Sequence, residues 1–229
     1  MKYIIKGKTF DFSEEDLDYL YLGEGTEATC YRIRDYENDF VMKIHHDKPE
    51  KTTLDKETCK IIKNIDTERI KLPNELIYDE DGNYLGYTID YVDYKKPKIR
   101  SLKISKLVDD FYTLERDIDK LTKNNIYVDD LNIGNTIFSD GIYICDPGSF
   151  SIAEEKDEKR YLNYYNRTNI NEYEIDEIIF NLFRFTTRER NRIRDLIFSD
   201  DEYLSDILKY LGFDKEEKAN NYFKQLVYR

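Results

Sequence analysis

Three polar residues surround a predicted β-hairpin in the middle of the chain, and their spacing strongly restricts the fold. Asp130 lies before the hairpin, Asn135 stands at its start, and Asp146 follows its second strand. Two apolar runs, 137–138 and 142–144, flank a Ser-Asp-Gly turn, which is typical of paired antiparallel strands. If the runs pair directly across this turn, Asn135 and Asp146 lie side by side at its open end, about 5 to 8 Å apart.

An amide oxygen and a carboxylate in this arrangement can share a Mg²⁺ ion, which takes oxygen ligands and keeps phosphates as partners. We therefore expect Asn135 and Asp146 to hold Mg²⁺. Asp130, on the loop that enters the hairpin, is left to face a nucleophile. Asp and Asn also form ordinary turns, but this spacing around a hairpin is harder to obtain by chance. The set predicts a phosphotransfer site.

The composition argues against several classes of partner. The 229 residues carry a net charge of −12, and the pI is near 4.8, which disfavours sequence-independent binding to nucleic acid and docking on anionic lipid. No apolar run approaches the roughly 20 residues of a membrane helix, and the N-terminus lacks a signal-peptide core. The cysteines are odd in number and widely spaced. We therefore expect reduced thiols, a cytoplasmic location, no nucleic-acid partner and no membrane partner.

The periodicity changes near the middle of the chain. Short β-prone runs and one helical segment come first, at 3–5, 9–12, 19–22, 29–34, 39–44, 52–65 (helix), 75–78 and 84–92. Helical periodicity then dominates around the hairpin, at 104–124, 173–184, 187–198, 202–212 and 215–228, with a Ser199-Asp-Asp capping cluster. These patterns predict an α+β chain: a small antiparallel sheet lobe with one helix over 1–92, and a mainly helical lobe over 93–229. A ligand commonly binds between two such lobes.

Gly23 and Gly25 form a Gly-x-Gly turn between two strand-like runs. The pattern fits a turn whose bare backbone approaches phosphates, but Gly-x-Gly alone is more often an ordinary hairpin turn. A dinucleotide-binding fingerprint requires a helix after the glycines, and here a strand follows. No Gly-Lys-Ser/Thr is present after the turn either, which excludes a Walker A loop.

Lys43 stands in the middle of the apolar strand 40–44. A strand lysine usually faces solvent, but this one could instead contact phosphates, and it would then need a carboxylate partner. Glu57 and Asp55 both flank the apolar face of the helix that follows, and periodicity does not choose between them. We favour Glu57 because its side chain is longer.

Taken in order, these segments resemble the protein-kinase-like superfamily from about residue 10 to residue 150. The resemblance implies binding of ATP and Mg²⁺, with Lys43, held by Glu57, on the α- and β-phosphates and Asp130 as the group that orients the acceptor hydroxyl and takes its proton. The other matching positions are the glycine loop at Gly23 and Gly25, the hinge at Asp90 and Val92, the metal ligands Asn135 and Asp146, and the Asp-Pro-Gly segment 146–148.

Several positions depart from the kinase pattern. Ala28 replaces the third loop glycine, Val128 and Asp129 replace His-Arg before Asp130, and Pro147 replaces a phenylalanine. A glycine before Asn135, here Gly134, resembles the catalytic loop of aminoglycoside- and choline-type phosphotransferases. The short helical lobe is similar to that of compact bacterial effector-type kinases. The resemblance implies a kinase that transfers phosphate to an alcohol group, and we favour a protein Ser/Thr acceptor. A nucleotide-binding pseudokinase that serves as an interaction module, or a small-molecule kinase, remains as an alternative.

Overall fold

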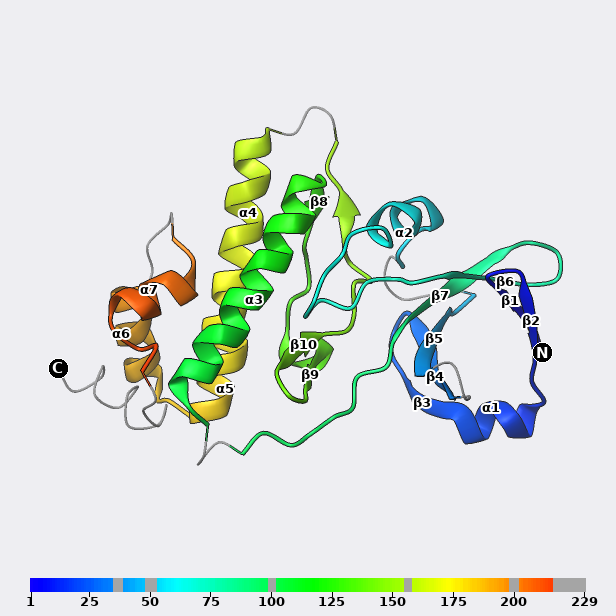
Figure 1. The fold of residues 1–229 in the computed structure, drawn as a ribbon, viewed down its shortest axis with the longest axis horizontal. Coiled ribbons are helices and arrows are strands. Elements are labelled where there is room, and N and C mark those ends of the chain that lie inside the picture. Colours follow the sequence, from blue (N-terminus) through cyan, green and yellow to red (C-terminus); the bar gives the residue numbers. More distant parts are fainter. Residues whose placement is uncertain (35–38, 48–52, 99–101, 155–157, 198–201, 216–229) are drawn as a thin grey trace.

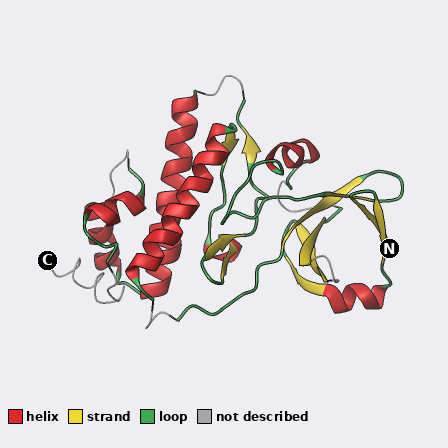
Figure 2. Cartoon of the chain, in the orientation of Figure 1, coloured by secondary structure: helices red, strands yellow, loops and turns green. Residues whose placement is uncertain are grey.

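The computed structural model describes residues 1–34, 39–47, 53–98, 102–154, 158–197 and 202–215. A curled antiparallel sheet occupies one side of the molecule, and long helices occupy the other (Figures 1 and 2). The first part of the chain contains β1 (Lys2–Ile5), β2 (Lys8–Asp11), α1 (Glu14–Leu20), β3 (Tyr21–Glu24), β4 (Ala28–Arg34), β5 (Asp39–His45), α2 (Lys56–Ile62), β6 (Leu76–Tyr78) and β7 (Tyr84–Asp90).

The second part is mainly helical, as predicted. Its elements are α3 (Ile104–Lys123), β8 (Ile126–Tyr127), a 3₁₀ turn (Ile133–Asn135), β9 (Thr136–Phe138), β10 (Ile142–Ile144), β11 (Ser151–Ile152), α4 (Lys159–Glu172), a π-helix (Tyr173–Ile179), α5 (Phe180–Phe183), α6 (Thr187–Ile197) and α7 (Leu204–Tyr210). The helix predicted at 215–228 and the capping cluster at Ser199 lie outside the described residues, apart from residue 215.

The large sheet has seven strands in the order β2-β1-β6-β7-β5-β4-β3. Because side chains alternate along a strand, β5 serves two different layers. Met42 faces a cluster that includes Tyr3, Leu17 and Ile77, on the side covered by α1. Its neighbour Lys43 faces the opposite side, where α2 packs on the sheet. The sheet therefore separates a purely structural layer from the layer that carries the polar residues.

The strand predicted at 19–22 is wrong at its first half, because α1 ends at Leu20 and β3 begins at Tyr21. Ser13 starts the helix with a capping box: its hydroxyl accepts from the Asp16 backbone N–H, and Asp16 accepts from the Ser13 N–H. Only Leu17 of this helix is buried. A single buried apolar residue leaves no periodic signal, so the Ser-x-x-Asp pair was the one available indication of a helix.

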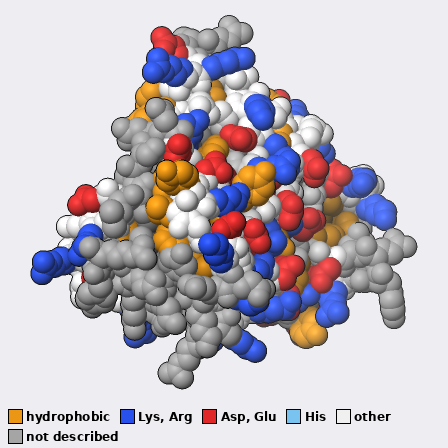
Figure 3. All heavy atoms as spheres, turned by 60° about the vertical axis from the view of Figure 1, so that its left-hand side comes forward, with side chains coloured by type: hydrophobic (Ala, Val, Ile, Leu, Met, Phe, Trp, Pro, Cys, Tyr) orange, Lys and Arg blue, Asp and Glu red, His pale blue; other side chains and the backbone are white. Residues whose placement is uncertain are grey.

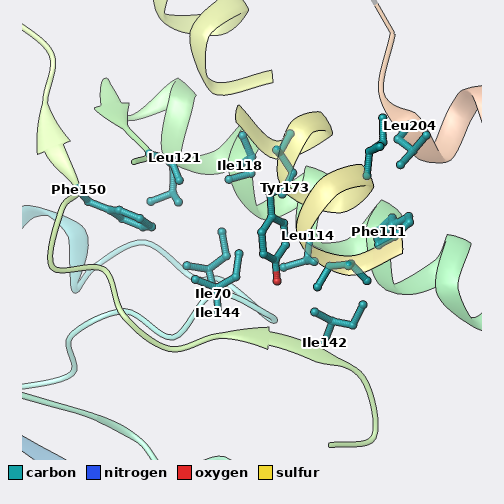
Figure 4. Packing of buried hydrophobic residues seen from close by; sticks show 14 of the residues in the cluster. Ile70, Phe111, Leu114, Ile118, Leu121, Ile142, Ile144, Phe150, Tyr173 and Leu204 are labelled. Atoms are coloured by element: carbon teal, nitrogen blue, oxygen red, sulfur yellow. The ribbon is translucent and has the colours of Figure 1, made fainter. Parts of the chain in front are cut away.

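The helix α3 confirms the predicted apolar repeat, since Leu107, Phe111, Leu114, Ile118 and Leu121 are all buried. Figure 4 shows several of them packed with residues of β10, the π-helix and α7. Burying such a stripe is the main source of helix stability in a folded chain. The helix is therefore the central support of the helical part.

The segment after α2 crosses to α3 before it returns to the sheet. Ile70 forms a parallel bridge with Ile144 of β10. The buried Asp117 of α3 accepts hydrogen bonds from the backbone N–H groups of Glu68 at 2.8 Å and Arg69 at 2.6 Å. These contacts join the sheet part of the chain to the hairpin of the helical part.

Acidic and basic side chains are interspersed on the face shown in Figure 3, with small apolar areas between them. Within the described part of the chain, no helix has both the length and the apolar character needed to span a membrane.

Candidate functional site

Lys43 lies inside the molecule, with an exposed fraction of 5%. Strand register places it opposite Cys30 of β4 and Tyr87 of β7. Its ammonium group lies 5.8 Å from the centre of the Tyr87 ring. Of the two orientations that the sequence left open, the structure contains the inward one.

Two carboxylates contact the Lys43 ammonium. Lys43 Nζ donates to Asp146 Oδ1 at 2.5 Å, although the two residues are 103 positions apart in the sequence. The same nitrogen lies 3.5 Å from Glu27 Oε2. Glu27 belongs to the turn between β3 and β4 and is only 8% exposed. The sequence alone does not single out Glu27, because a glutamate in a turn is normally solvated.

The expected pair between Glu57 and Lys43 does not form. Glu57 points into solvent with a side-chain exposure of 71%, and it pairs with Lys60 at 2.7 Å. Asp55 is not the partner either, because it caps α2 by accepting from the Glu57 and Thr58 backbone N–H groups. The helix is shorter than predicted and begins only after Asp55. Its first turn therefore holds both acids at the capping end.

The glycine turn is a β-hairpin, as the sequence suggested. Gly23 pairs with Cys30 across β3 and β4, and the Gly25 N–H donates to the Ala28 carbonyl at 3.0 Å. A Cβ atom built on Gly23 or Gly25 would meet nothing within 4 Å. The space beside both glycines is open, so a ligand could approach their backbone.

The loop before the hairpin is held together by its own amides. Asp130 has a left-handed backbone with φ of 55°, a conformation that Asp tolerates better than most residues. Asn132 Nδ2 donates to Asp130 Oδ1 at 2.8 Å, and Asn135 Nδ2 donates to the Asp130 carbonyl at 2.9 Å. Asn132 also accepts from the Asn135 N–H at 3.1 Å. Asn132 thus shapes the loop, a role that the sequence analysis missed.

The hairpin register agrees with the prediction. Phe138 pairs with Ile142, and the Cys145 N–H donates to the Asn135 carbonyl at 2.9 Å. Asn135 and Asp146 therefore meet at the open end of the hairpin. The oxygens Asn135 Oδ1 and Asp146 Oδ2 accept no hydrogen bond from another described residue. This pair of hard oxygen donors fits a Mg²⁺ ion.

One continuous helical segment supports the Asp130 loop from behind. In α4, the fully buried Asn166 accepts from the Val128 N–H at 2.9 Å, and Asn169 Nδ2 donates to the Val128 carbonyl at 2.9 Å. In the π-helix, Glu177 accepts from the Ile133 N–H at 3.0 Å. Val128 is itself fully buried. The position where the kinase pattern has a basic or aromatic residue is here an apolar anchor.

A cavity of about 270 Å³ lies beside Asp130. Its walls come from the loop, α4 and the π-helix, and carboxylates predominate among them: Asp129, Asp130, Glu172, Asp176 and Glu177. Asp129 accepts a hydrogen bond from Tyr165, and Asp176 pairs with Arg194. Carboxylates therefore supply most of the polar lining of this cavity.

The predicted hinge follows β7, which ends at Asp90. Asp90 Oδ1 accepts from Asn74 Nδ2 at 2.6 Å, so its side chain is engaged. The Tyr91 ring lies under the Arg32 guanidinium, 3.3 Å from the ring centre. Val92 is half-buried, and its backbone N–H and C=O make no hydrogen bond to another described residue.

No protein-family model matches the chain, and no curated protein sequence matches it. Among solved structures, it is similar to the kinase PK-1 of Cydia pomonella granulovirus, with a TM-score of 0.43 and 23% identity over 58% of this chain and 53% of that one. The chain thus spans about half the length of that kinase. It is also similar to a chain of the CAK complex of Chaetomium thermophilum bound to ATP-γ-S, with a TM-score of 0.54 and 14% identity over 86% of this chain and 69% of that one. The protein therefore has a two-lobed, protein-kinase-like fold.

Proposed function

We propose that this protein is an ATP- and Mg²⁺-dependent phosphotransferase that acts on an alcohol group. The observation that supports this best is the bond between Lys43 of the sheet and Asp146 at the end of the hairpin, with Asn135 at the start of the hairpin paired to Cys145, the neighbour of Asp146. A cation for phosphates beside two oxygen ligands for a metal is the arrangement that phosphoryl transfer requires. We also propose that the boundary between the two lobes lies between residues 92 and 93. The free cysteines favour a cytoplasmic location, where thiols stay reduced.

Each residue has a proposed task. Lys43 would bind the α- and β-phosphates, the open backbone at Gly23 and Gly25 would cover them, and the backbone at Asp90 and Val92 would meet adenine. Asn135 and Asp146 would hold Mg²⁺, which neutralises charge on the phosphates when it is bound.

Asp130 would orient the acceptor hydroxyl. As the acceptor oxygen forms its bond to the terminal phosphorus, the bond from that phosphorus to the leaving ADP oxygen breaks. The hydroxyl proton passes to the Asp130 carboxylate. Catalysis of this kind depends on positioning and on charge more than on covalent chemistry, and the fixed amides of the Asp130 loop supply that positioning.

We favour a protein Ser/Thr hydroxyl as the acceptor, with a small amino alcohol as the second choice. The carboxylate-rich cavity beside Asp130 would repel an anionic acceptor and attract a cationic one. A positively charged peptide and a small aminated alcohol both satisfy that condition.

A nucleotide-binding pseudokinase is the rival proposal, and Val128 and Pro147 motivate it. Proline restricts the backbone after Asp146, and the buried Val128 offers no charge beside Asp130. Both proposals require ATP binding, so only turnover separates them.

The test is transfer of labelled phosphate from the terminal position of ATP to the protein itself, to basic Ser/Thr peptides and to small amino alcohols. We expect Asp130→Asn and Asp146→Asn to abolish transfer without unfolding the chain, as a cooperative thermal transition of each variant would show. Asp140→Asn is the matched control, because Asp140 lies at the exposed hairpin tip with a side-chain exposure of 72%. Unchanged transfer in both variants would overturn the proposal, and ATP binding without any transfer would favour the pseudokinase.

A further inference from the structure

We propose that Glu27 is the positioning carboxylate of Lys43, and that the nucleotide-covering turn supplies this charge in place of α2. The inference rests on the proposed function, and it concerns how Lys43 is held for a bound nucleotide. It assigns a role to a residue that no sequence pattern indicates.

Burial makes a charge partner for Lys43 necessary. Lys43 and Glu27 are 5% and 8% exposed, and a buried charge without a partner is costly. They form an ion pair at 3.5 Å, yet Glu27 Oε2 has no hydrogen bond within the described part of the chain. The Lys43 ammonium lies nearer to Asp146, at 2.5 Å. Glu27 therefore keeps an unused acceptor directed at Lys43.

The helix α2 cannot easily provide this partner. Its buried residues are Thr58, Cys59 and Ile62, none of which carries a carboxylate. Glu57 lies on the solvent side and is paired with Lys60. To bring Glu57 to Lys43, the helix would have to rotate and expose Cys59 and Ile62, which are fully buried. Burial of that apolar face opposes such a rotation.

The second carboxylate beside Lys43 becomes important when Asp146 also binds a metal ion. If Asp146 turns one oxygen to a metal ion, Lys43 loses part of its nearest partner. Glu27 then remains as the negative charge that fixes the ammonium while it contacts phosphates. Without Glu27, Lys43 and the metal would compete for the same Asp146 carboxylate.

The backbone around Glu27 is fixed to the strand that carries Lys43. The Glu27 carbonyl accepts from the His46 N–H at 2.9 Å, and the Gly25 N–H donates to the Ala28 carbonyl at 3.0 Å. The turn is therefore hydrogen-bonded to the end of the strand that carries Lys43. Closure of the turn over a nucleotide and placement of Lys43 would be a single event that does not depend on α2.

The test is calorimetric titration of Mg·ATP into the wild-type protein and its variants. We expect Glu27→Gln to weaken binding about tenfold or more, as loss of a close charge pair does. Glu57→Gln and Glu24→Gln should bind as the wild type does. Glu24 is the matched control because it ends β3 next to the same turn, its side chain is 58% exposed, and it contacts His46 instead of Lys43.

A double-mutant cycle separates positioning from general damage. In a Lys43→Met background, Glu27→Gln should cause no further loss, because its effect passes through Lys43. Equal losses in both backgrounds would overturn the inference, as would a loss confined to Glu57→Gln. Glu27→Asp keeps the negative charge but holds it farther from Lys43, so it should also weaken binding. This variant replaces Glu27→Gln in the test if Glu27→Gln does not fold.

The outcomes also separate this inference from the proposed function. If the wild type binds Mg·ATP and Glu27→Gln binds equally well, only the role of Glu27 is wrong. If the wild type does not bind Mg·ATP, the proposed function is wrong and the role of Glu27 falls with it.

Discussion

Gly148 shows how one absent side chain arranges the charged residues. A Cβ atom at this position would lie 2.4 Å from Glu27 Oε2 and 3.0 Å from Asp146 Oδ1. The backbone of Gly148 is not left-handed, so conformational freedom does not explain the glycine. Its N–H donates to Asp146 Oδ1 at 3.0 Å. Gly148 therefore leaves room for the Glu27 and Asp146 carboxylates, which a Cβ atom would displace.

Gly148→Ala should destabilise the fold by about 1 to 3 kcal/mol, the usual cost of overpacking. In a Glu27→Ala background the cost should be smaller, because the closest colliding atom is gone. Gly25→Ala is the control for stability, since a Cβ there meets nothing within 4 Å. The measurement is denaturant unfolding of the wild type, the three single variants and the Glu27→Ala/Gly148→Ala double variant, and an identical cost of Gly148→Ala in both backgrounds would refute this explanation.

The polar residues of the site differ in how well the sequence predicts their positions and roles. Asn135 and Asp146 could be placed together because a short hairpin has few registers, and the structure has the predicted one. Lys43 could be identified as a candidate but not oriented, because alternation alone does not tell which face is buried. Glu27 and Asn132 could not be found, since their roles depend on contacts between separate turns.

At the scale of elements, the segment from α4 through α5 determines how the Asp130 loop is held. Its amides satisfy the backbone around Val128, and its π-helix reaches Ile133 and Thr136. After the hairpin, periodicity predicted helix only from residue 173 onward, so α4 was missed. The buried residues of α4 are Leu162, Asn166, Ile170 and Asn171. Half of that face is amide, so the apolar repeat that reveals a helix is too weak to detect.

Two buried carboxyl groups join α3 to the π-helix. Burial raises the pKa of Glu115 to about 7, and burial together with the nearby Glu115 raises the pKa of Glu174 well above its usual value. Glu115 also accepts from the Ser205 N–H at 2.8 Å, which ties α7 to the pair. Protonation of these carboxyls is thus part of the packing between three helices.

Stability should fall as pH rises from about 4.5 to about 7. Over this pH range, a carboxyl with a raised pKa stays protonated in the folded state but ionises in the unfolded chain. The unfolded chain is thereby stabilised, and the free energy of unfolding falls. For Glu115 the loss is about 3 kcal/mol.

Glu115→Gln should flatten this decline in denaturant unfolding between pH 5 and 7.5. Glu68→Gln, with a side-chain exposure of 68%, should retain the wild-type slope. An equal slope in Glu115→Gln would show that other groups control the pH dependence.

At the scale of the whole molecule, contacts of two different kinds connect the sheet part to the helical part among the described residues. One set joins the segment after α2 to α3 and β10, through Asp117 and the bridge between Ile70 and Ile144. The other is the bond between Lys43 and Asp146. The first is a permanent structural link, whereas the second uses the groups that a metal-bound nucleotide would contact. Mg·ATP is therefore expected to replace the second link and to strengthen the connection between the two parts.

Titration of Mg·ATP, followed by calorimetry, tests this expectation most directly. The wild type should bind one Mg·ATP, and at 100 times the dissociation constant the ligand should stabilise the fold by about 2.7 kcal/mol. Chelation of Mg²⁺ or the Asp146→Asn substitution should weaken binding at least about tenfold, the loss that removal of one partner of a close charge pair produces. Asp140→Asn should bind normally. Absence of binding in the wild type, or equal binding in Asp146→Asn, would contradict the account.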